Sequence, residues 1–209
     1  MADPTPTPAL PIRPGALQSI VEFILELDKL KGVTRKTRPL GLERYENSAE
    51  HSWQIALLAA SLVHHAPKSA DGESAIDLDR VIHMLLVHDI GEIDTGDTMV
   101  YVVGGWEERK AAERAAAERI FGLLPEPQGG HFLALWLEFE EGVSPEARFA
   151  NAVDRAMPVL LNLANDGQSW RDCAGDPADG TTLTLASMTG AARISFATNG
   201  TRAVLNDRR

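Results

Sequence analysis

The chain has 209 residues, with 30 acidic against 20 basic side chains, a formal net charge of −10 and a hydrophobic content of 44%. This length supports one domain with a substantial core, and the ordinary hydrophobic content argues against a disordered chain. The acidic balance argues against a nucleic-acid polymer as partner, because negative side chains repel the phosphate backbone. No apolar run approaches the roughly 20 residues that span a bilayer. Cys173 is the single cysteine, so we expect no intrachain disulfide and a cytoplasmic location. Because no apolar run is long enough to span a bilayer, we expect no membrane partner.

Helical periodicity governs most of the chain after a proline-rich start. Residues 1–14 contain five prolines and are expected to form a disordered leader. The apolar spacing predicts a first helix over 16–31. Asn47 with Glu50 resembles a capping box at the start of a helix that ends before Pro67. Further helices are predicted from near Asp77 to His88, over 106–124, over 131–141, and from Ser144–Pro145 towards Asn165.

The helix predicted over 106–124 has the composition of a charged surface helix. Its acidic and basic residues recur at four-residue spacing, which predicts two ion pairs, Arg109–Glu113 and Arg114–Glu118. Trp106 and Trp136 stand at helical positions and are interpreted as core or dimer-face residues. Residues 173–209 are rich in Gly, Thr, Ser and Asp, without a sustained helical period. We therefore expect an all-α domain over 15–172, followed by an irregular or weakly strand-forming tail.

His88 and Asp89 are adjacent at the predicted end of a buried helix. Neighbouring side chains on a regular helix point about 100° apart, so they converge on one ligand only where the helix ends or unwinds. Gly91 favours such a break. A histidine with a carboxylate is half of a divalent metal site. Downstream, Asp154 stands in an apolar stretch, where a carboxylate is costly to bury unless it is paired or coordinated.

Taken in order, these motifs resemble those of the HD-domain superfamily, and in particular its branch of small 5′-deoxynucleotidases. The resemblance covers about residues 16–172 and implies an all-α helical bundle around a divalent metal site. The matching segments are Asn-Ser-Ala-Glu-His-Ser at 47–52, His-Asp-Ile-Gly-Glu at 88–92, Thr-Gly-Asp at 95–97, Pro-Glu-Ala-Arg-Phe at 145–149 and Val-Asp-Arg at 153–155.

The resemblance also implies a role for individual residues. Glu92 matches the acidic residue that orients or deprotonates the attacking water, and Asp97 matches a residue that contacts the sugar. Arg35 aligns with a phosphate-binding arginine, although three other cations of the same loop compete for this role: Lys36, Arg38 and Arg44. The implied metal ligands are His51, His88, Asp89 and Asp154.

One metal ion is expected rather than two. Binuclear members of the family need extra histidines between the His-Asp pair and the last aspartate, and only His131 lies there, at the start of a separate helix. The identity of the ion stays open among Mn, Co, Mg, Ni, Fe and Zn.

The expected activity is metal-dependent hydrolysis of deoxynucleoside 5′-monophosphates by a homodimer, with a small-molecule nucleotide as its partner. Two alternatives stay open. One is an HD hydrolase that acts on nucleoside triphosphates or phosphodiesters. The other is a nucleotide-binding regulator without turnover.

Overall fold

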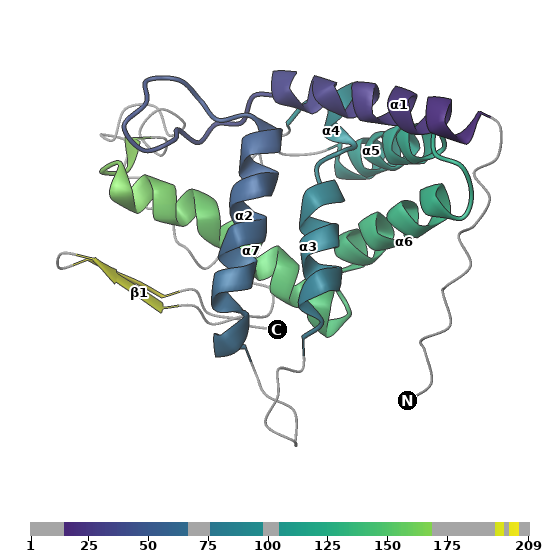
Figure 1. Ribbon diagram of the computed structural model, residues 1–209. Helices are drawn as coiled ribbons and strands as arrows, with labels where there is room; N and C mark the ends of the chain where they lie inside the picture. The colour runs from purple at the N-terminus through teal and green to yellow at the C-terminus, as the bar shows by residue number, and fades with distance from the viewer. Residues whose placement is uncertain (1–14, 67–75, 98–104, 169–194, 199–200, 205–209) are drawn as a thin grey trace, which may run out of the picture.

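The computed structural model describes residues 15–66, 76–97, 105–168, 195–198 and 201–204 (Figure 1). The predicted leader (1–14) and Cys173 lie outside these residues. The described elements, in chain order, are α1 (Ala16–Leu27), the 3₁₀ segment η1 (Asp28–Gly32), α2 (Ser48–Leu62), η2 (Val63–His65), α3 (Leu78–Val87), α4 (Glu92–Thr95), α5 (Trp106–Phe121), α6 (Gln128–Glu141), α7 (Pro145–Ala164), β1 (Ser195–Thr198) and β2 (Thr201–Val204). The predicted all-α fold class is confirmed, while the domain bounds 15–172 stay a prediction.

Side-chain caps set the beginnings of three helices. The Asn47 side chain accepts a hydrogen bond from the Glu50 amide, and the Glu50 carboxylate accepts one from the Asn47 amide, which completes the predicted capping box of α2. The Asp77 side chain caps α3 by accepting from the Arg80 amide, and the Ser144 side chain caps α7 by accepting from the Ala147 amide. The helix predicted over 16–31 is shorter than expected, because α1 ends at Leu27 and the chain tightens into η1.

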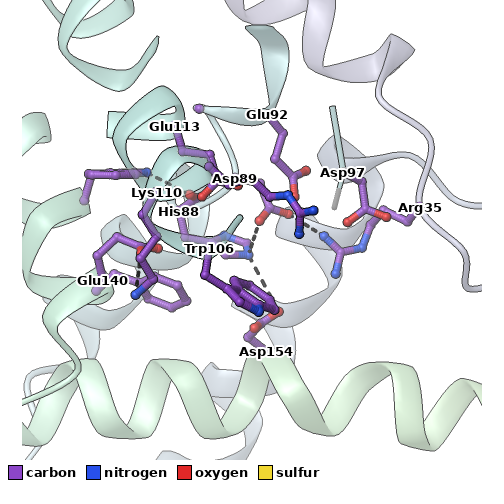
Figure 2. Close-up of a pocket in the computed structure, with 14 residues that line it drawn as sticks. Arg35, His88, Asp89, Glu92, Asp97, Trp106, Lys110, Glu113, Glu140 and Asp154 are labelled. Atoms are coloured by element: carbon purple, nitrogen blue, oxygen red, sulfur yellow. Dashed lines mark hydrogen bonds and ion pairs between the residues drawn. The ribbon is translucent and has the colours of Figure 1, made fainter. Parts of the chain in front are cut away.

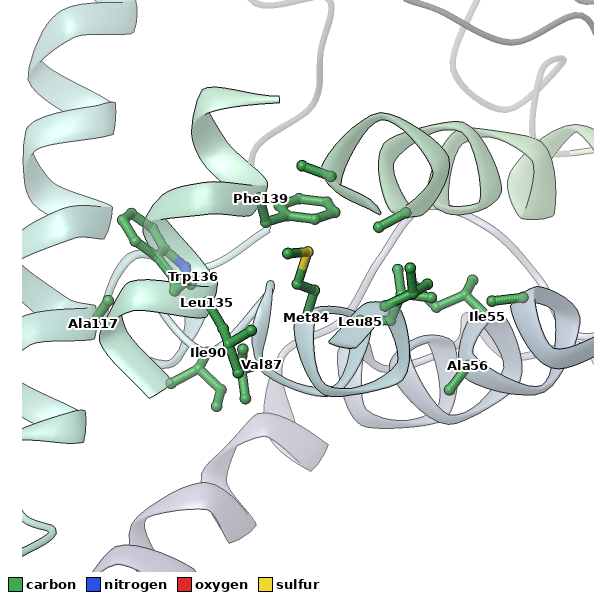
Figure 3. Close-up of a cluster of buried hydrophobic side chains, with 14 of the residues drawn as sticks. Ile55, Ala56, Met84, Leu85, Val87, Ile90, Ala117, Leu135, Trp136 and Phe139 are labelled. Atoms are coloured by element: carbon green, nitrogen blue, oxygen red, sulfur yellow. The ribbon is translucent and has the colours of Figure 1, made fainter. Parts of the chain in front are cut away.

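The helices pack around α3, which contacts α2, α6 and α7 (Figure 1). Ile55 of α2, Met84 and Leu85 of α3 and Leu135 of α6 are almost completely buried and meet in one cluster (Figure 3). Each such side chain stabilises the fold by about 1.5–3 kcal/mol relative to an exposed position. The cluster fixes the C-terminal end of α3, and the candidate site begins at the next residue.

The predicted tail contains a β-hairpin. Strands β1 and β2 pair antiparallel, with Ser195 opposite Val204 and Thr198 opposite Thr201. This agrees with the weakly strand-forming character of the sequence, while residues 173–194 lie outside the described part. Among the described residues, no helix has the length and hydropathy needed to cross a membrane.

Candidate metal centre

The chain leaves α3 through tight turns that bring His88 and Asp89 together. The amides of Ile90 and Glu92 donate to the carbonyls three residues earlier, at 3.2 and 3.0 Å, so the helix tightens into 3₁₀ geometry. His88 Nε2 then lies 2.9 Å from Asp89 Oδ1. A Cβ atom at Gly91 would lie 2.9 Å from the Glu113 carbonyl oxygen, so only glycine lets this turn pack directly against α5.

Helices α2 and α7 complete the cluster. His51 Nε2 lies 2.8 Å from Asp154 Oδ1, and His88 Nε2 lies 3.7 Å from the same oxygen. Ligand atoms of these three residues all lie within 4.8 Å of one another, which is a spacing that can hold a metal ion. We refer to His51, His88, Asp89 and Asp154 together as the metal end.

The hydrogen bonds of His88 suit a metal ligand. Its Nδ1 bonds to the Leu85 carbonyl oxygen at 2.8 Å, which assigns the proton to Nδ1 and leaves the Nε2 lone pair directed at the carboxylates. Nε2 is buried, and among the described residues it has no hydrogen-bond partner. Trp136 Nε1 donates to the His88 carbonyl oxygen at 2.9 Å and so fixes the backbone at this position. The two imidazoles and the Asp154 carboxylate of this cluster are donor types that fit a divalent ion, and the Asp89 carboxylate lies beside them.

The charges of the metal end also call for a cation. Burial alone would lower the pKa of His88, yet the facing carboxylates of Asp89 and Asp154 raise it well above its usual value. Burial alone would likewise raise the pKa of both aspartates, but His88 holds the pKa of Asp89 down and the two histidines hold that of Asp154 well below its usual range. The two carboxylates are therefore ionised, and a divalent ion can take the place of a proton on the cluster.

A folded-back loop places Arg35 against the metal end. The Arg35 amide donates to the Glu46 carbonyl oxygen at 3.0 Å, and Ser48 donates to Val33 at 3.0 Å, so the two strands of the loop run side by side before α2. Arg35 Nη1 then donates to Asp89 Oδ2 at 2.7 Å. The three rival cations lie elsewhere: Arg44 pairs with Glu50, and both Lys36 and Arg38 lie over the Tyr45 ring.

Glu46 is a site residue that the sequence interpretation missed. Its side chain is 2% exposed, and its Oε1 lies 3.7 Å from His51 Nδ1 and 3.6 Å from Arg35 Nε. Burial raises the pKa of Glu46 to about 7. No periodic signal marks this position, because it stands in a polar loop; its one sequence signal is that it directly precedes the capping box at Asn47.

A cavity of about 240 Å³ opens beside the metal end (Figure 2). Of the predicted site residues, those that line it are Arg35, His88, Asp89, Glu92, Asp97 and Asp154. His51 is fully buried behind them against Asp154. The structure thus brings all seven predicted residues to one place.

Glu92 and Asp97 carry perturbed carboxyl groups in this cavity. Burial, reinforced by the nearby Asp89 carboxylate, raises the pKa of Glu92 to about 8. Ser48 Oγ donates to Glu92 Oε2 at 2.6 Å, which leaves Oε1 as the free acceptor. Burial also raises the pKa of Asp97. A carboxyl group poised near neutrality suits proton transfer.

The opposite side of the cavity was not predicted. In Figure 2, Lys110 and Glu140 lie across from Arg35 and Asp97. We call the four cavity-lining residues of α5 the α5 wall: Trp106, Arg109, Lys110 and Glu113. Trp136 and Phe139 of α6 are buried next to it, as expected for core residues.

The structure contradicts one prediction for α5 and excludes one of the two interpretations of Trp106. Trp106 is 41% exposed and lines the cavity, so it is not a core residue, and its alternative place on a dimer face stays a prediction. Its expected neighbour pair, Arg109–Glu113, does not form within the described residues, because the Arg109 guanidinium lies over the Trp106 ring at 5.8 Å from its centroid. The other predicted pair, Arg114–Glu118, forms at 2.9 Å on the exposed surface.

Comparisons with known proteins show relatives of this fold. A solved structure described as a predicted metal-dependent phosphohydrolase, from Magnetospirillum magnetotacticum MS-1, is 39% identical and superposes with a TM-score of 0.71 over 81% of this chain and 82% of that chain. A protein of Pyrococcus horikoshii OT3, 22% identical, shares the fold with a TM-score of 0.52 over 76% of this chain and 83% of its own.

The curated relatives of this chain include 5′-deoxynucleotidases. The 5′-deoxynucleotidase HDDC2 of Xenopus laevis is 27% identical over 154 residues, which cover 71% of this chain and 72% of the relative. The human 5′-deoxynucleotidase HDDC2 is 27% identical over 144 residues, or 68% of this chain and 66% of its own. The family model described as HD domain matches residues 27–181. The chain therefore belongs to the HD domain family and is a phosphohydrolase of that family.

Proposed function

We propose that this phosphohydrolase cleaves deoxynucleoside 5′-monophosphates to the deoxynucleoside and inorganic phosphate. One observation carries the proposal: Glu92 and the ligand atoms of the metal end open on the same small cavity, beside Arg35 and Asp97. Its volume of about 240 Å³ lies just under the range of roughly 300–1,000 Å³ typical of drug-sized ligands, which favours a mononucleotide over a larger substrate. The names of the relatives support the same substrate class.

In this proposal His51, His88, Asp89 and Asp154 hold one divalent ion. When bound, such an ion polarises the phosphoryl group and offsets the charge that develops on it. The four side chains contribute a fixed geometry: the His88 ring is held by Leu85, and Asp89 is held by Arg35.

Glu92 is the proposed general base. Ser48 holds Oε2, so Oε1 can accept a proton from a water molecule whose oxygen attacks phosphorus. As the bond from phosphorus to the sugar 5′ oxygen breaks, the same proton can pass to that leaving oxygen. A base with a pKa near the working pH combines availability with proton affinity, and burial gives Glu92 a pKa of about 8.

Arg35 and Asp97 are proposed to orient the substrate. A guanidinium beside the metal end can donate to two phosphate oxygens at once, and the Arg35 side chain is already ordered by its bond to Asp89. Asp97 lines the same cavity and can accept a hydrogen bond from a sugar hydroxyl.

Hydrolysis of nucleoside triphosphates remains the second candidate, because Arg109 and Lys110 add two cations to the cavity. The geometry makes these two cations less favourable phosphate ligands than Arg35. Lys110 Nζ lies 4.0 Å from the Glu140 carboxylate, and the Arg109 guanidinium lies over Trp106. The homodimer and the cytoplasmic location stay predictions, as does the absence of a nucleic-acid polymer partner.

A substrate panel tests the proposal. Purified protein is assayed with Mn²⁺ or Co²⁺, and in parallel with EDTA, on the deoxynucleoside and ribonucleoside monophosphates and on the corresponding triphosphates. We expect metal-dependent release of orthophosphate from deoxynucleoside monophosphates. Release of pyrophosphate from triphosphates would favour the second candidate, and no hydrolysis of any nucleotide would favour a regulator.

A further inference from the structure

One face of α5 changes character halfway along the helix. Positions three and four residues apart share a face of an α-helix. On this face of α5 the four residues of the α5 wall line the cavity, and Ala116, Ala117, Ile120 and Phe121 continue the stripe into the core. The N-terminal half of the stripe therefore faces a ligand-sized cavity, whereas the C-terminal half packs against the side chains of the core.

Trp106 gives this wall an aromatic surface. Its side chain is 41% exposed although the residue belongs to the inward-facing stripe. The Arg109 guanidinium lies over the ring, and a cation in this position restrains the indole. An indole held at the edge of a cavity offers a flat face on which a nucleobase can stack.

Arg109 gives the wall an unsatisfied donor. Its Nη1 is buried and has no hydrogen-bond partner within the described residues. A guanidinium has donors only and cannot be neutralised by losing its proton, so a buried N–H without a partner is unfavourable until a ligand supplies an acceptor. Arg114, four residues before Glu118 on the outer face of the same helix, is already paired.

We propose that the α5 wall binds the nucleobase of the substrate, and that Trp106 stacks on the base while Arg109 donates to a base edge with two acceptors. The proposal rests on the proposed nucleotidase function, and it adds the substrate preference. Guanine presents two acceptors, N7 and O6, on one edge, which matches an arginine fork. On this edge adenine keeps N7 but has an amino donor in place of O6, cytosine has an amino donor, and thymine offers one carbonyl acceptor; the N3 and O2 acceptors of cytosine lie on a different edge of the base. The expected order is dGMP, then dTMP, then dAMP and dCMP.

The test compares kcat/KM for these four deoxynucleotides and for 2-deoxyribose 5-phosphate, which has the phosphate and sugar without a base. In wild-type protein we expect dGMP to exceed dAMP and dCMP by tenfold or more, on the order of what one bidentate arginine–guanine contact gives. This comparison needs no variant. Equal values for all four bases would overturn the proposal.

Two substitutions separate the base from the phosphate. Arg109→Gln should remove the preference for dGMP and leave kcat/KM for 2-deoxyribose 5-phosphate unchanged. Trp106→Ala should lower kcat/KM for every base by roughly tenfold, with recovery in Trp106→Phe. Arg114→Gln makes the same charge change on the outer face of α5 and should behave as wild type. If Arg109→Gln lowered kcat/KM for 2-deoxyribose 5-phosphate as much as for dGMP, Arg109 would be a phosphate ligand and the proposal would be wrong.

Calorimetric measurement of nucleotide binding to Mn²⁺-loaded Glu92→Gln protein distinguishes failure of this proposal from failure of the proposed nucleotidase function. Tighter binding of dGMP than dAMP, lost in the Glu92→Gln/Arg109→Gln double variant, would support the proposal even if wild-type protein hydrolysed none of these nucleotides. Hydrolysis of all four with equal binding would overturn the proposal alone. Neither binding nor hydrolysis would contradict both.

Discussion

At the metal end of the cavity, His88 Nε2 faces carboxylate oxygens of Asp89 and Asp154 at 2.9 and 3.7 Å, whereas at the α5 wall the buried Nη1 of Arg109 has neither a hydrogen bond nor a facing carboxylate among the described residues. At the metal end opposite charges face one another, Arg35 holds the Asp89 carboxylate, and the cluster is suited to a divalent ion. Arg109 of the α5 wall forms no such ion pair with the described residues. The difference indicates that the metal end is built for chemistry on one fixed group, and that the α5 wall is built to be completed by a variable one.

Loss of a ligand should affect the metal end most strongly. Asp154→Asn removes the carboxylate that faces both His51 and His88. We expect Mn²⁺ affinity to fall by more than the roughly 10- to 100-fold that loss of an outer partner costs, and hydrolysis to become undetectable. Titration calorimetry with Mn²⁺ checks the affinity, and circular dichroism checks that the helices are retained. Full metal affinity in this variant would contradict the assignment of the ligands.

Replacing the proposed base should abolish turnover without removing the metal. Glu92→Gln keeps the size of the side chain and removes its ability to accept a proton, so we expect kcat to fall by about 10²- to 10⁴-fold. Mn²⁺ binding should stay close to wild type. Glu22→Gln, an exposed change on α1, is the matched control. Near-normal turnover in Glu92→Gln would show that another group takes the proton.

Glu46 gives a smaller effect on the metal end, through His51. Its Oε1 lies 3.7 Å from His51 Nδ1, a separation that a small shift of the ring would convert to a hydrogen bond. Glu46→Gln should therefore weaken Mn²⁺ binding by roughly 10- to 100-fold. Glu43→Gln, in the same loop and with a 99% exposed side chain, should leave the affinity unchanged. Equal affinity in both variants would make Glu46 a structural residue only.

The metal end could be predicted from the sequence because each of its ligands belongs to a local motif. His51 follows a capping box, and His88 and Asp89 stand where a buried helix meets Gly91. Asp154 is a charged residue in an apolar stretch, which is itself a signal. The all-α class followed from the periodicity of the same segments, and the helix boundaries differ at helix ends, such as the 3₁₀ segment Asp28–Gly32 that follows α1.

The α5 wall could not be predicted in this way. Trp106, Arg109, Lys110 and Glu113 have the composition of a solvated helix face, and periodicity does not distinguish polar residues that face water from those that face a cavity. The distinction depends on contacts between segments far apart in the sequence, such as the approach of Gly91 to the Glu113 carbonyl. Glu46 was missed for the same reason, because its burial comes from Arg35 and His51.

The smallest predicted effect concerns the pH dependence of the proposed base. Glu92 must be ionised to act, so kcat/KM should rise with pH towards the pKa of Glu92, and a bound cation that offsets Asp89 brings this rise below pH 8. The Ser48 hydrogen bond favours the ionised form and lowers this pKa. Ser48→Ala should therefore move the rise to higher pH, by up to about one unit, with little change at high pH.

The control for this shift is Ser61→Ala on the same helix, where the hydroxyl bonds to the Leu57 carbonyl oxygen on the exposed side. Its pH profile should match that of wild type. A shift to lower pH in Ser48→Ala would contradict the assignment of Glu92 as the base.

A crystal structure of Glu92→Gln protein with Mn²⁺ and dGMP tests the division of the cavity most directly. The account predicts anomalous density for one ion among His51, His88, Asp89 and Asp154, with the phosphate beside it and the guanine stacked on Trp106 within hydrogen-bond distance of Arg109. An ion elsewhere, or a nucleotide bound with its phosphate on Arg109 and its base away from α5, would contradict it.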